Sequence, residues 1–291
     1  AFLVGFVIAA LYWQKEAYAL LPLLLIMTFS LGAIFEFYHL TDRGLEGRAV
    51  RLVGYLAGAG IILSFYAEAM IGSGQGGDIK ALLRYFYPGQ SLLGFWLILC
   101  TIGALVGHLL FRPLDGTIYG TGITVAGVLY GSLTLGHAFP LLFQDGGSFY
   151  LLLVAAITFM TDTGAYFAGR WFGRHNAGFK VSPRKTIEGY VGGYIVGMLS
   201  ALAFFYGFQN QAGQASTGLF QSPLEIILFS IVFSTLAILG DLSESALKRD
   251  ARVKDSASII PGHGGVLDLI DALLFTLPAA YYYIHFKAVL F

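Results

Sequence analysis

Charged residues are scarce in this chain of 291 residues, at 12% against roughly 25% in soluble domains. So few charges cannot cover a surface that faces water, and 57% of the residues are hydrophobic. The 17 lysines and arginines are balanced by 17 aspartates and glutamates, which excludes a nucleic-acid binder that works through excess positive charge. The composition therefore predicts a protein whose solvent is the lipid bilayer.

Several common functional signals are also missing. The single cysteine, Cys100, excludes an intrachain disulfide and a cysteine metal cluster, and its apolar surroundings favour a small buried hydrophobe. The glycine-rich stretch 72–77 is followed by no Gly-Lys-Ser/Thr, so it predicts a flexible loop and no P-loop. The apolar stretch 1–13 lacks a basic lead-in, so we do not expect a cleavable signal peptide there.

Long hydrophobic runs predict an all-α, polytopic integral membrane protein with about nine transmembrane helices, each of about 20 apolar residues. The candidates are 1–13, 17–40, 49–71, 91–111, 117–141, 147–169, 187–208, 223–247 and 265–287. Only two connections look substantial, 170–186 and 248–264. We expect residues 1–145 to form a scaffold that could hold dimer contacts, and residues 146–291 to form the catalytic region with both long loops.

The distribution of lysine and arginine predicts the orientation in the membrane, because such residues favour cytoplasmic loops. The loops after the second, fourth, sixth and eighth helices carry Arg43, Arg48, Arg51, Arg112, Arg170, Arg174, Lys180, Arg184, Lys185, Lys248, Arg249, Arg252 and Lys254. The opposite side carries Lys15, Lys80, Arg84 and Lys287. Both long loops should therefore face the cytoplasm from the cell's inner (plasma) membrane.

Carboxylates gather at the predicted cytoplasmic ends of the late helices. A charge within a hydrophobic segment costs several kcal/mol unless it faces a cavity or a partner. Glu36, Glu68 and Glu225 are isolated cases that we interpret as structural. The clustered acids, which indicate a functional site, are Asp162, Asp241, Glu244, Asp268 and Asp271.

Residues 240–271 combine acids, a hydroxyl and an amine at helical spacing. Asp241, Ser245 and Lys248 follow i, i+4, i+7 and share one helix face. Asp268 and Asp271, at i and i+3, share a face of the next helix. Carboxylates from two helices suit Mg²⁺, which prefers oxygen ligands and substrate phosphates.

A glycine turn, 261–265, lies directly before the last predicted helix. Glycine lets the backbone approach an anion closely, and free N–H groups at a helix start attract phosphate. We interpret His263 within this turn as a hydrogen-bond donor more than as a general base. Phosphate charge would also be offset by the nearby cations Lys248, Arg249, Arg252 and Lys254.

A second polar stretch, residues 162–193, surrounds the other long loop. Asp162, Tyr166 and Gly169 stack on one face of the sixth predicted helix. A Ser182-Pro183 turn follows, and Thr186 and Glu188 lie at the next helix start. Five cations lie within this segment, more than topology alone requires: Arg170, Arg174, Lys180, Arg184 and Lys185.

At these residues the chain resembles the phosphatidate cytidylyltransferase (CDP-diacylglycerol synthase) family. The family signature is Ser-x-x-Lys-Arg, four residues, Lys-Asp, then Pro-x-His-Gly-Gly and Asp-Arg-x-Asp. The chain reads Ser245-Ala-Leu-Lys248-Arg249, Lys254-Asp255, Pro261-Gly-His263-Gly264-Gly265 and Asp268-Leu269-Ile-Asp271. The stretches Asp162-Thr-Gly-Ala-Tyr166 and Ser182-Pro-Arg-Lys185-Thr186-Ile-Glu188-Gly are similar to further family segments. Leu269 replaces the family's arginine, which puts in doubt either the details of phosphate contact or the identity of the lipid substrate.

The resemblance implies an inner-membrane homodimer that transfers CMP from CTP to phosphatidic acid. It implies Asp241 and Asp268 as ligands of Mg²⁺, with room for a second, monovalent cation such as K⁺. The CTP pocket would include Asp162, Ser182, Lys185 and Thr186. We expect the catalytic residues to be Asp241, Lys248, Arg249, Asp268 and Asp271. We expect substrate contacts from Asp162, Tyr166, Arg170, Ser182, Lys185, Thr186, Glu188, Ser245, Lys254, His263, Gly264 and Gly265.

Three other functions would each require different features in the sequence. A CTP-dependent polyprenol or phytol kinase would transfer the γ-phosphoryl group and need a base for its alcohol. A CDP-alcohol phosphotransferase would need Asp-Gly-x-x-Ala-Arg, and neither Asp115-Gly116 nor Asp145-Gly146 continues that way. A cation-coupled transporter would place carboxylates near the membrane midplane in both halves, whereas here they cluster at the ends of late helices.

Overall fold

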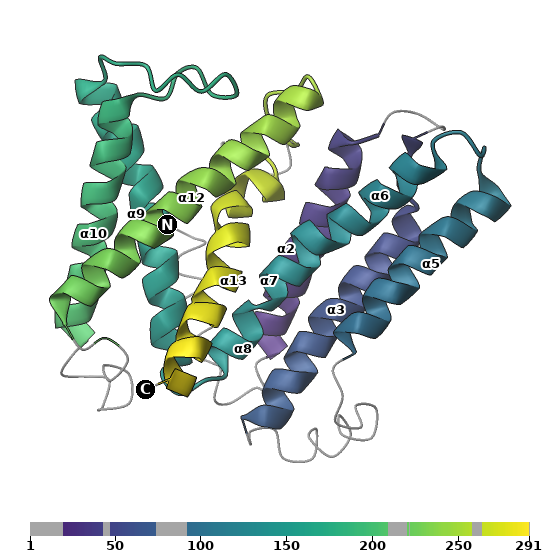
Figure 1. Cartoon of the computed structure of the whole chain (residues 1–291), viewed down its shortest axis with the longest axis horizontal. Helices are drawn as coiled ribbons and strands as arrows, with labels where there is room; N and C mark the ends of the chain where they lie inside the picture. The colour runs from purple at the N-terminus through teal and green to yellow at the C-terminus, as the bar shows by residue number, and fades with distance from the viewer. Residues whose placement is uncertain are drawn as a thin grey trace. The chain divides into compact units, whose positions relative to one another are not determined.

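The protein is an assembly of long helices (Figure 1). The computed structural model describes residues 20–42, 47–73, 92–208, 220, 222–257 and 264–290. Within these ranges, eight helices are long and apolar enough to cross a membrane, which confirms the all-α polytopic class. The same ranges contain no strand, only an isolated bridge between Asn176 and Thr186. The first predicted span, 1–13, lies outside the described residues.

The chain divides into two compact units. The first comprises Ala1–Phe143 together with Ser256–Leu267, and the second comprises Gln144–Asp255 together with Asp268–Phe291. Ser256–Leu267 thus belongs to the unit of the N-terminal helices, although it overlaps the predicted loop 248–264 and the start of the last predicted helix.

Four membrane-length helical segments form the described part of the first unit. They are α2 (Leu20–Leu40), α3 (Arg51–Gly72), α5 (Leu93–Phe111) and the span that α6 (Thr117–Val128) begins. That last span continues through η3 (Leu129–Leu133), α7 (Thr134–Gly136) and α8 (Ala138–Leu142). Helix α3 packs against α2, α5 and α6.

Buried hydroxyls tie the helices of the first unit together. The Tyr38 hydroxyl donates to the Thr124 carbonyl at 2.7 Å, and the hydroxyls of Ser30 and Ser132 lie 2.6 Å apart. Each of these polar groups is nearly or fully buried. In an apolar medium an unpaired hydroxyl is expensive, so these pairs fix which helix faces meet.

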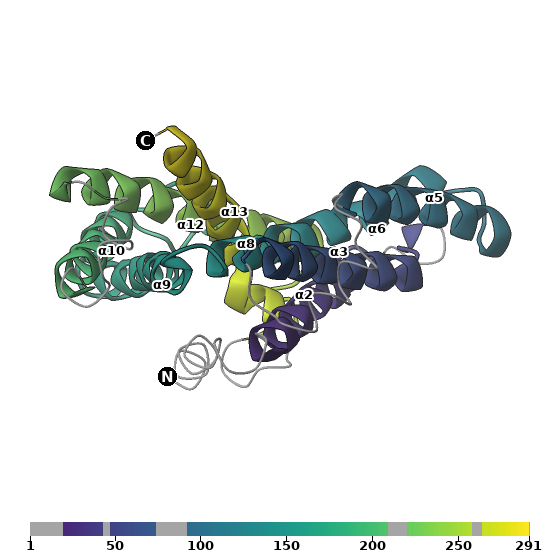
Figure 2. The same cartoon turned by 90° about the horizontal axis from the view of Figure 1, so that it is seen from below.

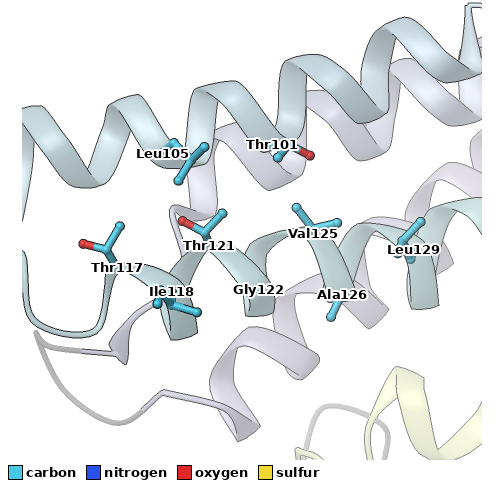
Figure 3. Close-up of a pocket in the computed structure, with 9 residues that line it drawn as sticks. All are labelled: Thr101, Leu105, Thr117, Ile118, Thr121, Gly122, Val125, Ala126 and Leu129. Carbon is cyan, nitrogen blue, oxygen red and sulfur yellow. The ribbon is translucent and has the colours of Figure 1, made fainter.

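An open groove lies between α5 and α6 in the first unit (Figure 3). Its volume is about 490 Å³. The residues that line it are Thr101, Leu105, Thr117, Ile118, Thr121, Gly122, Val125, Ala126 and Leu129. None of them is ionisable, so the groove supplies no group for acid–base or metal chemistry.

The second unit consists of α9 (Gly147–Phe172), α10 (Ile187–Phe208), α12 (Pro223–Asp250) and most of α13 (Val266–Leu290). Helices α9 and α10 lie side by side in both views (Figures 1 and 2), and α12 packs on both. The hydroxyl of Thr158 on α9 donates to that of Thr276 on α13 at 3.3 Å.

Local signals explain how α12 begins and where it is fastened. Ser222 caps the helix by accepting the Glu225 N–H, and Pro223 occupies the first turn, where its missing N–H costs nothing. The Glu225 carboxylate pairs with Lys287 and accepts the Tyr283 hydroxyl at 3.1 Å. Glu225 thus joins the start of α12 to the end of α13, in keeping with its interpretation as a structural residue.

Two helices extend past their predicted ends. Helix α9 continues to Phe172 and α12 continues to Asp250, whereas the hydrophobic runs end at 169 and 247. The predicted loop starts at 170 and 248 are therefore wrong by about one turn. Lysine and arginine are good helix formers and are favoured near a helix C-terminus. Each helix can therefore continue beyond the end of its hydrophobic run. Lys248 and Arg249 consequently lie on α12.

Candidate active site

Lys185 lies close to several carboxylates of the second unit. It lies between α9 and α10, and its ammonium pairs with the carboxylate of Asp241 on α12. Burial lowers the pKa of the Lys185 ammonium below its ordinary value, whereas the nearby carboxylates of Asp162 and Asp271 act in the opposite direction. The Lys185 ammonium therefore interacts electrostatically with carboxylates of α9, α12 and α13. This arrangement indicates a compact, acid-rich site around the amine.

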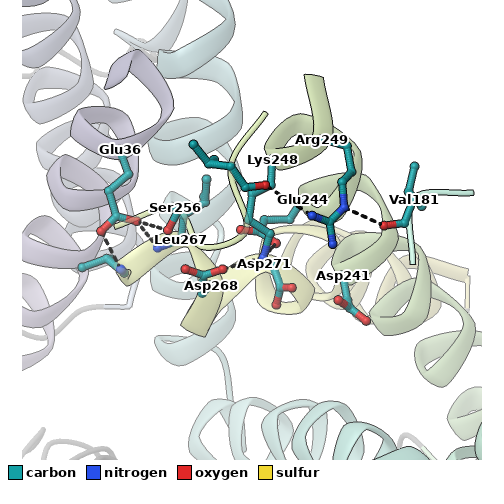
Figure 4. Close-up of polar contacts among 12 residues, drawn as sticks. Glu36, Val181, Asp241, Glu244, Lys248, Arg249, Ser256, Leu267, Asp268 and Asp271 are labelled. Atoms are coloured by element: carbon teal, nitrogen blue, oxygen red, sulfur yellow. Dashed lines mark hydrogen bonds and ion pairs between the residues drawn. The ribbon is translucent and has the colours of Figure 1, made fainter. Parts of the chain in front are cut away.

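Lys248 is the second cation of the cluster (Figure 4). Its ammonium lies 2.5 Å from an oxygen of Asp268 and also pairs with Glu244, one turn earlier on α12. Glu244 is fully buried. The sequence places Glu244 among the clustered acids but gives it no catalytic or binding role, although its spacing of i, i+4 to Lys248 predicts this ion pair. Because the Lys248 ammonium contacts both Glu244 on α12 and Asp268 on α13, it links the two helices.

Helices α12 and α13 approach closely beside these residues because Gly240 has no side chain. A Cβ at this position would lie 2.7 Å from the Asp271 carbonyl oxygen and 2.8 Å from the Ala272 Cα. Backbone atoms cannot move aside as the end of a side chain can. Gly240 therefore sets the spacing between the helices that carry Asp241 and Asp271.

Gly240→Ala should separate the two helices. We expect a stability loss of about 1–3 kcal/mol from overpacking and a fall in turnover of roughly 10- to 100-fold from misplaced acids. Thermal unfolding in detergent and the rate of product formation measure the two effects. The control is Gly122→Ala, since a methyl group there meets nothing within 4 Å. Equal behaviour of the two variants would contradict this account of Gly240.

The segment that carries Lys185 is held by its own hydrogen bonds. The Ala177 N–H donates to the Lys185 carbonyl and the Ile187 N–H donates to the His175 carbonyl, each at 2.9 Å. Glu188 accepts the N–H groups of Arg174 and His175 at 3.1 and 3.2 Å, and its carboxylate lies 2.5 Å from the His175 ring. Glu188 therefore shapes this segment in the structure.

Two further contacts connect this segment to its neighbouring helices. The Thr186 hydroxyl accepts the Gly189 N–H at 3.1 Å, which caps the start of α10. The Arg249 guanidinium donates to the Val181 carbonyl at 3.2 Å, which ties the last turn of α12 to the same segment. Together these contacts orient Lys185 toward Asp241.

The other residues predicted to contact substrate differ in their exposure and in their hydrogen bonds. Tyr166 and Arg170 are exposed and hydrogen bond to each other at 3.1 Å. Ser182 accepts the Lys185 N–H through its carbonyl at 3.2 Å. Ser245 is partly buried on α12 and Lys254 is exposed. His263 lies outside the described residues.

The start of α13, directly after the glycine turn, differs from the expectation of free N–H groups. The N–H groups of Val266 and Leu267 donate to the carboxylate of Glu36 on α2, each at 2.7 Å. The expectation that these two N–H groups are free for phosphate is therefore wrong. A buried acid of the first unit already occupies the position that an anion would take.

The donor set of the second unit fits Mg²⁺ only as an ion shared with substrate. Asp241 and Asp268 supply hard oxygen atoms, and each pairs with a lysine ammonium in the structure. In the part of the chain that the structure describes, no three His, Cys, Asp or Glu side chains are grouped to hold a metal. Mg²⁺ in proteins commonly uses one or two carboxylates plus waters and substrate phosphates, so this set is sufficient.

Comparison with known proteins agrees with this chemistry. Residues 1–287 match the sequence model of the cytidylyltransferase family. The phosphatidate cytidylyltransferase of Haemophilus influenzae is 41% identical over 142 residues, 48% of this chain and 47% of that protein. That of Bacillus subtilis is 38% identical over 136 residues, 47% of each chain. That of Synechocystis is 31% identical over 214 residues, 62% of this chain and 68% of that protein. The matches to the first two span about half of their length.

Proposed function

The chain belongs to the cytidylyltransferase family, and from this premise we propose that it transfers CMP from CTP to phosphatidic acid, giving CDP-diacylglycerol and pyrophosphate. The observation that carries the proposal is the alternation of lysines and carboxylates in the second unit, where Lys185 and Lys248 each hold an acid of α12 or α13. Such a site suits two polyanions and a divalent cation. The similar proteins of Haemophilus influenzae, Bacillus subtilis and Synechocystis are phosphatidate cytidylyltransferases, which supports the same reaction.

The chemistry requires little from a general base. The second pKa of a phosphomonoester is about 6, so the phosphate of phosphatidic acid is already anionic at neutral pH. One of its oxygens attacks the α-phosphorus of CTP in line. A new P–O bond forms as the bond from the α-phosphorus to the bridging oxygen breaks, and pyrophosphate leaves with that electron pair. His263 is therefore not needed as a base.

The obstacle is the repulsion between two polyanions. Asp241 and Asp268 would hold Mg²⁺, which when bound offsets the charge of the phosphate oxygens. Lys185, Lys248 and Arg249 donate to phosphate oxygens and stabilise the departing pyrophosphate. The acyl chains of the lipid stay in the bilayer while the headgroup meets soluble CTP.

We further propose that the reaction takes place at the cytoplasmic face of the inner membrane. The bias of lysine and arginine toward the loops that follow the even-numbered helices supports this orientation. A homodimer and a second, monovalent cation such as K⁺ stay predictions from the family resemblance.

Purified protein with phosphatidic acid, Mg²⁺ and CTP labelled at one phosphorus tests the reaction. We expect label to enter the lipid from the α position alone, because the β- and γ-phosphates leave as pyrophosphate. Removal of Mg²⁺ with EDTA should stop the transfer. Label from the γ position alone would identify a lipid kinase and overturn the proposal. No transfer from either position, with CTP unconsumed, would also overturn it.

A further inference from the structure

Glu36 is a buried acid that holds the start of a helix far away in sequence. Its side chain is fully buried on α2. One carboxylate oxygen accepts the Val266 N–H, and the other accepts the Leu267 N–H and the Ser256 hydroxyl, each at 2.7 Å (Figure 4). All of these residues belong to the first unit.

The three hydrogen-bond partners of the Glu36 carboxylate are neutral donors. An ionised carboxylate has only acceptors, and each of these three partners is a donor. Two of the donors are N–H groups at the start of α13, which have no partner within the helix and carry its positive dipole end. Glu36 therefore acts as a capping residue supplied by another helix.

The glycine turn leaves room for this cap. A Cβ on Gly265 would collide with the Ser256 hydroxyl and the Glu36 carboxylate. Gly264 has φ of 88°, a left-handed conformation that favours glycine. The two glycines thus have a role in the fold: they bring the backbone of the turn against a carboxylate of this chain.

We propose that Glu36 is a positioning residue for the transfer reaction, because it fixes the end of α13 from which Asp268 projects. Asp268 directly follows Leu267, whose N–H Glu36 holds. A helix whose first turn is fastened cannot fray or rotate there, so the direction of the Asp268 side chain is set. The inference rests on the proposed function, since it assigns Asp268 a part in that reaction.

Glu36→Gln is the direct test. The amide keeps the size of the side chain, but it loses the charge and presents an N–H₂ to donors. We expect faster hydrogen exchange confined to the peptide that covers residues 264–270. We also expect kcat to fall by roughly 10- to 100-fold and the Mg²⁺ concentration for half-maximal rate to rise, with little change in KM for CTP. A role in stability alone would lower the unfolding temperature and leave kcat per folded molecule unchanged.

The matched control is Glu68→Gln, which changes the same group on α3 of the same unit, outside the cap. It should keep the parental exchange pattern and kcat. If the parental protein transfers no CMP to phosphatidic acid, the proposed function fails, and the exchange result at 264–270 still reports on the cap. If the parent is active and Glu36→Gln has parental kcat, the positioning role is overturned.

Ser256→Ala tests the positioning role of Glu36 if Glu36→Gln does not fold. It removes one of the three hydrogen bonds and keeps both backbone bonds to α13. We expect a smaller rise in exchange at 264–270 and a fall in kcat of about 3- to 10-fold. Parental exchange and parental kcat in this variant would overturn the proposal.

Discussion

Asp241→Asn and Asp268→Asn are each expected to lower kcat by on the order of 10³-fold or more. Asparagine has nearly the same shape as aspartate, so the packing of α12 and α13 should persist. The substitution removes the negative charge that Lys185 or Lys248 now contacts. It also removes an oxygen ligand of the proposed Mg²⁺.

Transfer of label from α-labelled CTP to phosphatidic acid measures the loss, with membrane insertion followed in the same preparations. Asp115→Asn is the control, because Asp115 is an exposed acid of the first unit. It should show parental activity. Near-parental kcat in either site variant would refute the metal role of that aspartate. Excess Mg²⁺ should not restore either variant, since the lost group is the ligand itself.

The helices could be predicted from the sequence because a membrane leaves the backbone few choices. A spanning segment must satisfy its N–H and C=O groups internally, so each long apolar run becomes a helix. Eight of the nine predicted runs correspond to described helices. Their ends were less predictable, since Lys248 and Arg249 interrupt the hydrophobic run of α12 without ending the helix.

The pairings within the site were only partly predictable. Glu244 and Lys248 lie one helical turn apart, and that spacing alone suggests an ion pair. Nothing local links Lys185 to Asp241, because their contact depends on how the segment before α10 folds back to α12. The motif residues can therefore be identified from the sequence, whereas their interaction partners follow only from the three-dimensional structure.

Glu36 illustrates the same limit over a longer distance. As an isolated acid in a hydrophobic run, it was interpreted as structural, and its three hydrogen bonds agree with that interpretation. Its partners lie more than 200 residues away in sequence, where no spacing rule applies. The helix start after the glycine turn is predicted to attract a phosphate, and the carboxylate of Glu36 accepts two of that helix's N–H groups instead.

Lys248→Met should destabilise the protein strongly. Glu244 is 0% exposed and the Asp268 side chain is 10% exposed, so removal of the ammonium leaves two acids close together with little water. Breaking a buried ion pair in this way costs about 3–5 kcal/mol. We expect a clear fall in the thermal unfolding temperature in detergent, together with loss of CMP transfer. Lys180→Met, at an exposed cation, should leave the unfolding temperature unchanged.

Adding Glu244→Gln to Lys248→Met separates the two roles of the lysine. With Glu244 neutral, one of the stranded charges is gone, so much of the lost stability should return. Transfer should stay low, because no amine remains to contact the phosphates of CTP. The two single variants and the double variant form a cycle that measures the coupling between the residues. Recovery of kcat along with stability would mean that Lys248 serves only as a counterion, and the stabilisation of pyrophosphate would then rest on Lys185 and Arg249.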